Sequence, residues 1–279
     1  MTVLRSVLYM PSSNDRALEK AKAIPADAII FDLEDAVAPD AKELARSQAV
    51  AAVTSGDYGK RVLTIRCNGL DTPWGSADVA AAAAAKPDAI VIPKVSGPDH
   101  LRQIADLAGD SRIWAMVETP AALFAVREIA AFPQVDVLVM GTNDLVKELR
   151  ASLVPGRAPL VPHLATALLA AREAGVLILD GVYNDVKDAD GFRAECQQGK
   201  DMGFDGKTLI HPSQVEVCND IWAPSDQEVD HAKRVVEAFE EAAKDGRGVV
   251  TVDGRMVENL HRDIAEQVLA TAEAIAALG

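Results

Sequence analysis

Cysteine, aromatic residues and basic residues are all scarce in this sequence, and it has no long apolar run. Only three of its 279 residues are cysteines, and Cys67, Cys196 and Cys218 form no close pair along the chain. The Cys-x-x-Cys or His-x-x-x-His spacing of a zinc site does not occur. An odd number of scattered cysteines is typical of reduced thiols in a cytosolic protein, so we expect free thiols and a cytoplasmic location.

The apolar and charged residues exclude two further classes of protein. The longest apolar-rich stretch, Val79–Ala85, is too short to cross a bilayer, and the N-terminus lacks the pattern of a signal peptide. The net charge of −14 argues against nucleic acid and anionic membranes as partners. It is compatible with a small anionic substrate, because a few basic groups beside a site outweigh a distant acidic surface.

What the sequence does contain is a repeating alternation of short apolar runs and helix-like segments. Eight such runs each lead into polar or charged residues: Val7–Met10, Ala28–Phe31, Val62–Ile65, Ala89–Ile92, Ile113–Val117, Val135–Met140, Val176–Leu179 and Thr208–Ile210. Repeated β-then-α units in a chain of about this length are typical of a (β/α)8 barrel, or TIM barrel, an α/β fold whose active site lies where the strands end. The residues that follow the runs are therefore the candidates for chemistry.

The residues after the eighth run predict a C-terminal extension. They contain a helix to about Lys244, a hairpin turning at Asp253-Gly254 and a final helix from about Glu258 to Leu278. We therefore expect a catalytic barrel over residues 1–222 and a C-terminal lid of helices over residues 223–279.

Acidic residues follow three of the predicted strands. Glu118 and Asp144 follow the fifth and sixth strands, which are neighbours in a barrel built in chain order. Two carboxylates facing one cavity suit a hard divalent cation such as Mg²⁺, which uses one or two protein carboxylates and keeps several waters. The alternative is a pair of solvated loop carboxylates, and we favour the metal. Asp32, Glu34 and Asp35 follow the second strand and could hold metal-bound waters or orient basic groups.

Two basic residues follow the third and fourth strands. Arg66 could bind a carboxylate or stabilise negative charge on an oxygen, and it could also form a structural ion pair with the acids after the second strand. Lys94 has the same two interpretations. A Schiff-base role for Lys94 is disfavoured, because a metal at the acid pair would already stabilise an enolate.

The loop after the first strand is polar and basic. Ser12, Ser13 and Asn14 precede a helix that carries Arg16 and Lys20. A helix N-terminus with cations nearby suits a phosphate, although many helices begin with such residues.

Several of these segments resemble a known family when they are taken together. The segments RSVLYMPSSNDRALEKA, FDLEDAV, IRCN, VIPK, VET, GTNDL, DGVYND and GFDGKTLIHPSQ occur in this order. They resemble the HpcH/HpaI aldolase and citrate lyase β-subunit family, and within it the CitE-like branch of malyl-CoA and citramalyl-CoA lyases. The resemblance runs from Arg5 to the C-terminal helix.

The resemblance implies roles for the strand-end residues. It implies Mg²⁺, with Mn²⁺ as a substitute, on Glu118 and Asp144, and it places Arg66 at the reacting carbonyl of the substrate. It also implies that Gly141 and Thr142 contact the small keto acid. Glu34 and Asp35 would be catalytic together with Arg66, and Lys94 would contact the substrate.

The resemblance also implies how coenzyme A and a second subunit are bound. Ser13, Arg16 and Lys20 would take part in binding coenzyme A. Relatives form trimers or hexamers in which the lid of one subunit completes a neighbour's site with an acidic residue. In this chain that residue is Glu258, where many relatives have aspartate.

The implied activity is Mg²⁺-dependent cleavage of a carbon–carbon bond in a β-hydroxyacyl-CoA thioester. Malyl-CoA or citramalyl-CoA would give an acyl-CoA plus glyoxylate or pyruvate, in a reaction that can run in reverse. Arg66 would stabilise the enolate oxygen and Glu258 would transfer the proton. The alternatives are a (3S)-malyl-CoA thioesterase, a citrate lyase subunit acting on an acyl-carrier thioester, and a non-catalytic binding protein. Replacement of Arg66 is expected to remove activity and leave the fold intact.

Overall fold

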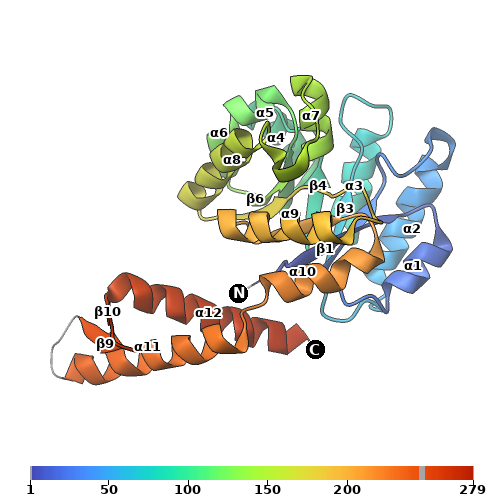
Figure 1. Ribbon diagram of the computed structural model, residues 1–279. Coiled ribbons are helices and arrows are strands. Elements are labelled where there is room, and N and C mark those ends of the chain that lie inside the picture. The colour runs from blue at the N-terminus through green and yellow to red at the C-terminus, as the bar shows by residue number, and fades with distance from the viewer. Residues whose placement is uncertain (1, 245–248, 279) are drawn as a thin grey trace. The chain divides into compact units, whose positions relative to one another are not determined.

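The central feature of the protein is a closed barrel of parallel strands (Figure 1). The structure is a computed structural model that describes residues 2–244 and 249–278. Eight strands follow one another around the barrel in chain order: β1 Ser6–Pro11, β2 Ala28–Asp32, β3 Val62–Arg66, β4 Ala89–Ile92, β5 Ile113–Val117, β6 Val135–Met140, β7 Leu177–Asp180 and β8 Gly206–Leu209. β8 pairs with β1 and closes the ring. The predicted (β/α)8 barrel is confirmed.

Helices follow the strands and surround the barrel (Figure 1). They are α1 Asp15–Ala21, α2 Lys42–Thr54, α3 Gly75–Ala85, α4 Pro98–Ala108, α5 Pro120–Phe124, α6 Val126–Ala130, α7 Thr142–Leu149, α8 Val161–Ala174, α9 Ala189–Met202 and α10 Val215–Trp222. Local chemistry sets several of their ends. The Asn14 side chain accepts a hydrogen bond from the Ala17 N–H at the start of α1, and Gly175 ends α8 in the left-handed conformation.

Alternate residues of the strands fill the interior of the barrel. Val7, Ile30, Val91, Trp114 and Leu179 belong to one buried apolar cluster. Because side chains alternate along a strand, the residue two positions further on faces the same interior one layer higher. The apolar layer therefore supports the side chains at the C-terminal ends of the strands, where active sites of this fold lie.

A group of buried charges lies where β7, β8, α9 and a 3₁₀ turn at Pro155–Arg157 meet. Lys207 is fully buried and places its Nζ 3.0 Å from Asp180 and 2.8 Å from Glu195. Arg157 also reaches Asp180, at 2.7 Å. Burial alone would raise the pKa of Asp180, but Lys207 and Arg157 outweigh burial and hold it below its ordinary value.

Replacement of Lys207 by methionine should destabilise the barrel by about 3–5 kcal/mol, because it leaves a buried carboxylate without one of its cations. Methionine keeps most of the side-chain volume, so the loss reports on charge. Urea unfolding of the wild type and the variant measures the difference. Arg127→Met is the matched control, since Arg127 forms an exposed pair with Glu173 that should contribute less than about 1 kcal/mol. Equal losses in the two variants would contradict the prediction.

The chain divides into two compact units, residues Leu4–Asn219 and the residues from Asp220 onward with those before Leu4. Within the second unit, α11 Asp226–Lys244 and α12 Asn259–Leu278 flank a hairpin of β9 Val250–Val252 and β10 Arg255–Val257. Apolar residues of all four elements pack into a separate core. The helix–hairpin–helix order matches the sequence-based expectation, and the use of this unit as a lid stays a prediction.

Two expectations drawn from composition can be compared with the structure. The thiols of Cys67, Cys196 and Cys218 are free, as expected from the sequence, and all three are buried. None of the helices within the described ranges is long and apolar enough to cross a membrane.

Candidate active site

A cavity of about 300 Å³ opens at the C-terminal ends of the barrel strands. Its lining comes from almost the whole ring: Tyr9, Asp32, Asp35, Ala36, Arg66, Met116, Glu118, Met140, Gly141, Thr142, Asn143, Asp144, Val182, Thr208 and Ile210. The structure thus brings together most of the residues that the strand ends suggested. They are far apart in sequence and meet because parallel strands of a barrel end at the same face.

Arg66 is held rigidly in the wall of this cavity. Its Nε and Nη2 atoms each lie 2.7 Å from one oxygen of Asp32, which is fully buried. Its Nη1 atom lies 2.8 Å from Glu34. The ion pair that the sequence offered as one interpretation is therefore present. This ion pair does not exclude binding of a substrate oxygen, because a guanidinium has more N–H donors than these bonds use. A buried, fixed cation of this kind can stabilise negative charge on a substrate oxygen.

Asp35 lines the cavity, whereas Glu34 contacts Arg66 but is not among the lining residues. The Glu34 side chain is only 11% exposed, and its carboxylate lies 3.7 Å from the Lys94 Nζ. Burial raises the pKa of Glu34, the charge of Arg66 opposes the shift, and Asp35 and Asp32 add to it. Asp35 is 70% exposed and lines the cavity. The raised pKa makes Glu34 a better proton acceptor than an ordinary exposed carboxylate.

Glu118 and Asp144 place their carboxylates at the same cavity. Glu118 follows β5, is buried, and accepts the backbone N–H of Lys94 at 2.7 Å. Burial, together with the nearby carboxylates of Glu34 and Asp144, raises the pKa of Glu118 to about 7, although the Lys94 N–H and the charge of Arg66 oppose the shift. Asp144 lies in the first turn of α7 and is half-buried.

This donor set fits a hard divalent cation. Carboxylates that repel one another across a cavity with room for water are suitable ligands for Mg²⁺, and a cation between them would relieve the repulsion. No group of three histidine, cysteine, aspartate or glutamate side chains in the described part of the chain is arranged to hold a metal. Glu118 and Asp144 are the residues that would hold the ion, together with waters and substrate oxygens.

Because Gly141 has no side chain, the Glu118 side chain can lie against its backbone. A Cβ at position 141 would lie 2.2 Å from the Glu118 Oε2 atom and 2.4 Å from its Cβ. Gly141→Ala should therefore displace the carboxylate and weaken Mg²⁺ binding about 10–100-fold, as loss of a group that orients a ligand typically does. Calorimetric titration with Mg²⁺ measures the effect. Gly109→Ala, at a surface turn with open space around it but with φ at +58°, should lower stability and leave metal affinity unchanged. Wild-type affinity in Gly141→Ala would show that Glu118 is not a ligand.

Several predicted residues lie outside the cavity. Ser13 is in the turn after β1, and Arg16 and Lys20 are exposed on α1; none of the three lines the cavity. Lys94 lines a neighbouring cavity with His100, and its side chain is half exposed. Their roles in binding coenzyme A and substrate stay predictions.

Glu258 belongs to the second compact unit. It lies between β10 and α12, is exposed, and donates its backbone N–H to the His261 Nδ1 atom at 3.0 Å. Its predicted role in proton transfer stays a prediction.

The sequence reasoning missed Tyr9. It lies in β1 two residues after Val7 and so shares the inward face of that strand. Its ring lies under Arg66, whose guanidinium carbon is 4.6 Å from the ring centroid. The signal was present in the run SVLYMP, where a tyrosine occupies the last inward position of a buried strand.

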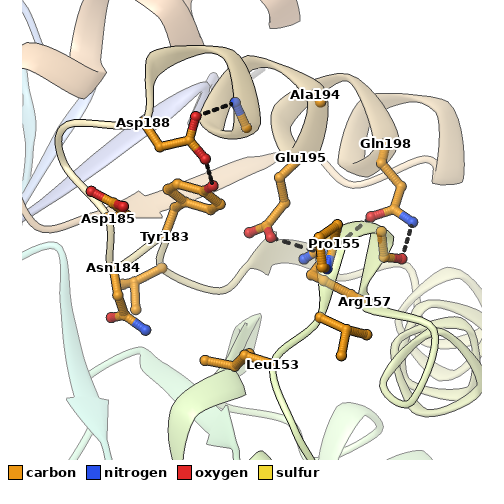
Figure 2. A pocket seen from close by; sticks show the side chains of 14 residues that line it. Leu153, Pro155, Arg157, Tyr183, Asn184, Asp185, Asp188, Ala194, Glu195 and Gln198 are labelled. Atoms are coloured by element: carbon orange, nitrogen blue, oxygen red, sulfur yellow. Dashed lines mark hydrogen bonds and ion pairs between the residues drawn. The ribbon is translucent and has the colours of Figure 1, made fainter.

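A larger cavity of about 500 Å³ lies beside β7, α9 and the Leu153–Arg157 segment. Figure 2 shows that its polar groups face one another: the Tyr183 hydroxyl donates to Asp188 at 2.6 Å, and Arg157 donates to Gln198 at 3.0 Å. No predicted site residue lines this space. We therefore assign the chemistry to the smaller cavity, where Arg66, Glu118 and Asp144 converge.

Similarity to known proteins identifies the family of the chain. Residues 5–212 match the HpcH/HpaI aldolase/citrate lyase family, and the chain belongs to that family of enzymes. Residues 158–276 also match the C–C bond lyase family of the TIM-barrel fold. The resemblance deduced from the sequence motifs is confirmed.

Individual relatives cover nearly the whole chain. It is 54% identical to a (3S)-malyl-CoA thioesterase of Cereibacter sphaeroides, over 99% of this chain and 96% of the relative. It is 35% identical to the citrate lyase subunit beta of Escherichia coli, over 96% and 93% of the two chains. The crystal structure of CitE from Mycobacterium tuberculosis in complex with magnesium, acetoacetate and coenzyme A aligns with a TM-score of 0.81 at 28% identity, over 97% and 98%.

Proposed function

We propose that this protein is a Mg²⁺-dependent enzyme that hydrolyses (3S)-malyl-CoA to malate and coenzyme A. The observation that carries the proposal is the convergence of Glu118, Asp144 and Arg66 on one cavity. The motifs in the sequence favoured carbon–carbon cleavage, with the thioesterase as the alternative. Full-length similarity to relatives named as thioesterases supports hydrolysis as our first candidate. Carbon–carbon cleavage of the same thioester is the second candidate, supported by similarity to citrate lyase subunit beta.

The cavity offers a separate group for each part of this substrate. Mg²⁺ held by Glu118 and Asp144 would polarise the oxygens that it contacts. The first turn of α7 begins at Thr142, and backbone N–H groups there have no partner within the helix, so they suit the free carboxylate of the substrate. The fixed guanidinium of Arg66 stabilises charge that develops on the thioester oxygen.

Hydrolysis needs a base, and Glu34 is the strongest candidate. In this step the oxygen of water bonds to the thioester carbon, the bond from that carbon to sulfur breaks, and the proton lost by water ends on the leaving sulfur. Glu34 can carry that proton because burial raises its pKa above that of an ordinary carboxylate. Asp35, at the exposed side of the cavity, would keep water and cations near Glu34.

Residues outside the cavity lining would bind the coenzyme A part of the substrate. Arg16, Lys20 and Ser13 after β1, with Lys94 after β4, would contact coenzyme A, whose phosphates attract exposed cations. We also propose a homotrimer or hexamer in which Glu258 of one subunit's lid completes a neighbour's site. Mn²⁺ should replace Mg²⁺, because both accept carboxylate and water ligands.

The test is incubation of the purified protein with (3S)-malyl-CoA and Mg²⁺ in ¹⁸O-labelled water, with and without EDTA. Hydrolysis predicts free coenzyme A and malate that carries one ¹⁸O atom in a carboxylate, and both should disappear with EDTA. Acetyl-CoA and glyoxylate would instead support carbon–carbon cleavage. If neither hydrolysis products nor cleavage products form, from (3S)-malyl-CoA or from citramalyl-CoA, both candidates are contradicted.

A further inference from the structure

Tyr9 places a phenol hydroxyl in the catalytic cavity without a hydrogen-bond partner among the described residues. Its residue position, two beyond Val7 in β1, makes it part of the cavity floor, above the apolar layer of the barrel. The Tyr9 side chain is half-buried, and a hydroxyl that lines a cavity with room for water is a site for a bound water or ligand atom.

The position of this hydroxyl is fixed by contacts on the ring. The Tyr9 ring packs against the apolar cluster of the barrel interior, and the guanidinium of Arg66 lies 4.6 Å from the ring centroid. Arg66 is itself held by Asp32 through two hydrogen bonds. A ring held from both sides presents its hydroxyl at one place, as the orientation of a small molecule requires.

The hydroxyl also keeps its proton. Burial raises the pKa of Tyr9 far above its ordinary value, the charge of Arg66 opposes the shift, and Asp32, Glu118 and Glu34 add to it. A neutral phenol both donates and accepts a hydrogen bond, so it can hold a water molecule and leave one of the water's protons for a carboxylate.

The two candidate reactions differ in their need for water. Hydrolysis requires a water molecule beside the thioester carbon, whereas carbon–carbon cleavage requires none. We propose that the Tyr9 hydroxyl holds the attacking water beside the thioester carbon and so determines that hydrolysis prevails over carbon–carbon cleavage. This inference rests on the proposed thioesterase function. The water oxygen bonds to the thioester carbon, Glu34 takes the released proton, the bond to sulfur breaks, and that proton passes to sulfur. Tyr9 keeps its own proton throughout.

The experiment is Tyr9→Phe, which removes one oxygen atom and keeps the ring under Arg66. Products from (3S)-malyl-CoA and Mg²⁺ are quantified by mass as malate plus coenzyme A and as acetyl-CoA plus glyoxylate. We expect the rate of hydrolysis to fall about 10–100-fold, the loss of one hydrogen bond to a reacting group. The ratio of cleavage products to hydrolysis products should rise by a similar factor, with Mg²⁺ affinity and thermal stability unchanged.

Tyr183→Phe is the matched control, because it removes a phenol oxygen in the larger cavity, where the hydroxyl bonds to Asp188. It should leave the product ratio unchanged. Wild-type hydrolysis in Tyr9→Phe, or an equal fall in both reactions, would overturn the inference and leave the thioesterase proposal standing. A wild-type protein that releases no malate from (3S)-malyl-CoA would instead overturn the proposed function itself.

Discussion

Replacement of Arg66 by alanine is expected to lower kcat/KM about 10²–10³-fold or more, as removal of a fixed donor to a developing oxyanion does. The structure adds a loss of stability to the intact fold that the sequence led us to expect, because the ion pair of Arg66 is buried. Asp32 is fully buried and forms two 2.7 Å hydrogen bonds with Arg66, so the variant leaves a buried carboxylate unpaired. Stability should therefore fall by about 3–5 kcal/mol. Steady-state kinetics below the melting temperature and urea unfolding measure the two losses separately.

Arg66→Lys distinguishes charge from geometry. Lysine keeps the positive charge but cannot form the paired hydrogen bonds of a guanidinium. We expect it to recover part of the lost stability and little of the activity. Near-normal turnover in Arg66→Ala at a temperature where it is folded would exclude Arg66 from the chemistry and leave it only the structural ion pair.

Replacement of Glu118 by glutamine is expected to abolish the response to Mg²⁺ and to lower activity about 10³-fold, because metal ions contribute several kcal/mol to such reactions. Glutamine has nearly the same shape, and its amide oxygen can still accept the Lys94 N–H that Glu118 accepts at 2.7 Å. The fold should therefore be unaffected. The measurement is initial rate against Mg²⁺ concentration, with EDTA-treated protein as the zero point.

Glu173→Gln supplies the control for loss of one acidic charge. Glu173 is 53% exposed and pairs with Arg127 on the surface of the protein, away from the cavity lining. The half-saturating Mg²⁺ concentration of the Glu173→Gln variant should equal that of the wild type. The same wild-type response in Glu118→Gln would mean that the ion is held elsewhere.

The strongest predictions from the sequence were those that depend on periodicity. Apolar runs separated by helix-like segments predict a closed barrel, and parallel strands in a barrel end at one face. Arg66, Glu118 and Asp144 could therefore be placed in one site before any contact between them was known. The sequence could not choose between the two roles of Arg66, because that choice depends on which acid lies within 3 Å of the guanidinium. In the structure Asp32 and Glu34 both do.

Other parts of the site depend on contacts between segments that are distant in sequence. Tyr9 was not singled out, since a tyrosine in a strand is usually a packing residue; only the position of Arg66 over its ring and the cavity above it give its hydroxyl a role. The buried charges of Arg157, Asp180, Glu195 and Lys207 come from a turn, two strands and a helix, and no local pattern links them.

The sequence by itself determined the barrel, the family and the edge at which chemistry occurs, because hydrophobic alternation and short motifs are local properties that chain order carries. The tertiary structure decided which groups are buried and paired. Burial and distance set the pKa values of Glu34 and Glu118, the rigidity of Arg66 and the free hydroxyl of Tyr9. These properties arise only when the ends of separate strands meet at one site. The effective dielectric constant there is lower than in water, so charges interact strongly and an unpaired polar group is destabilising.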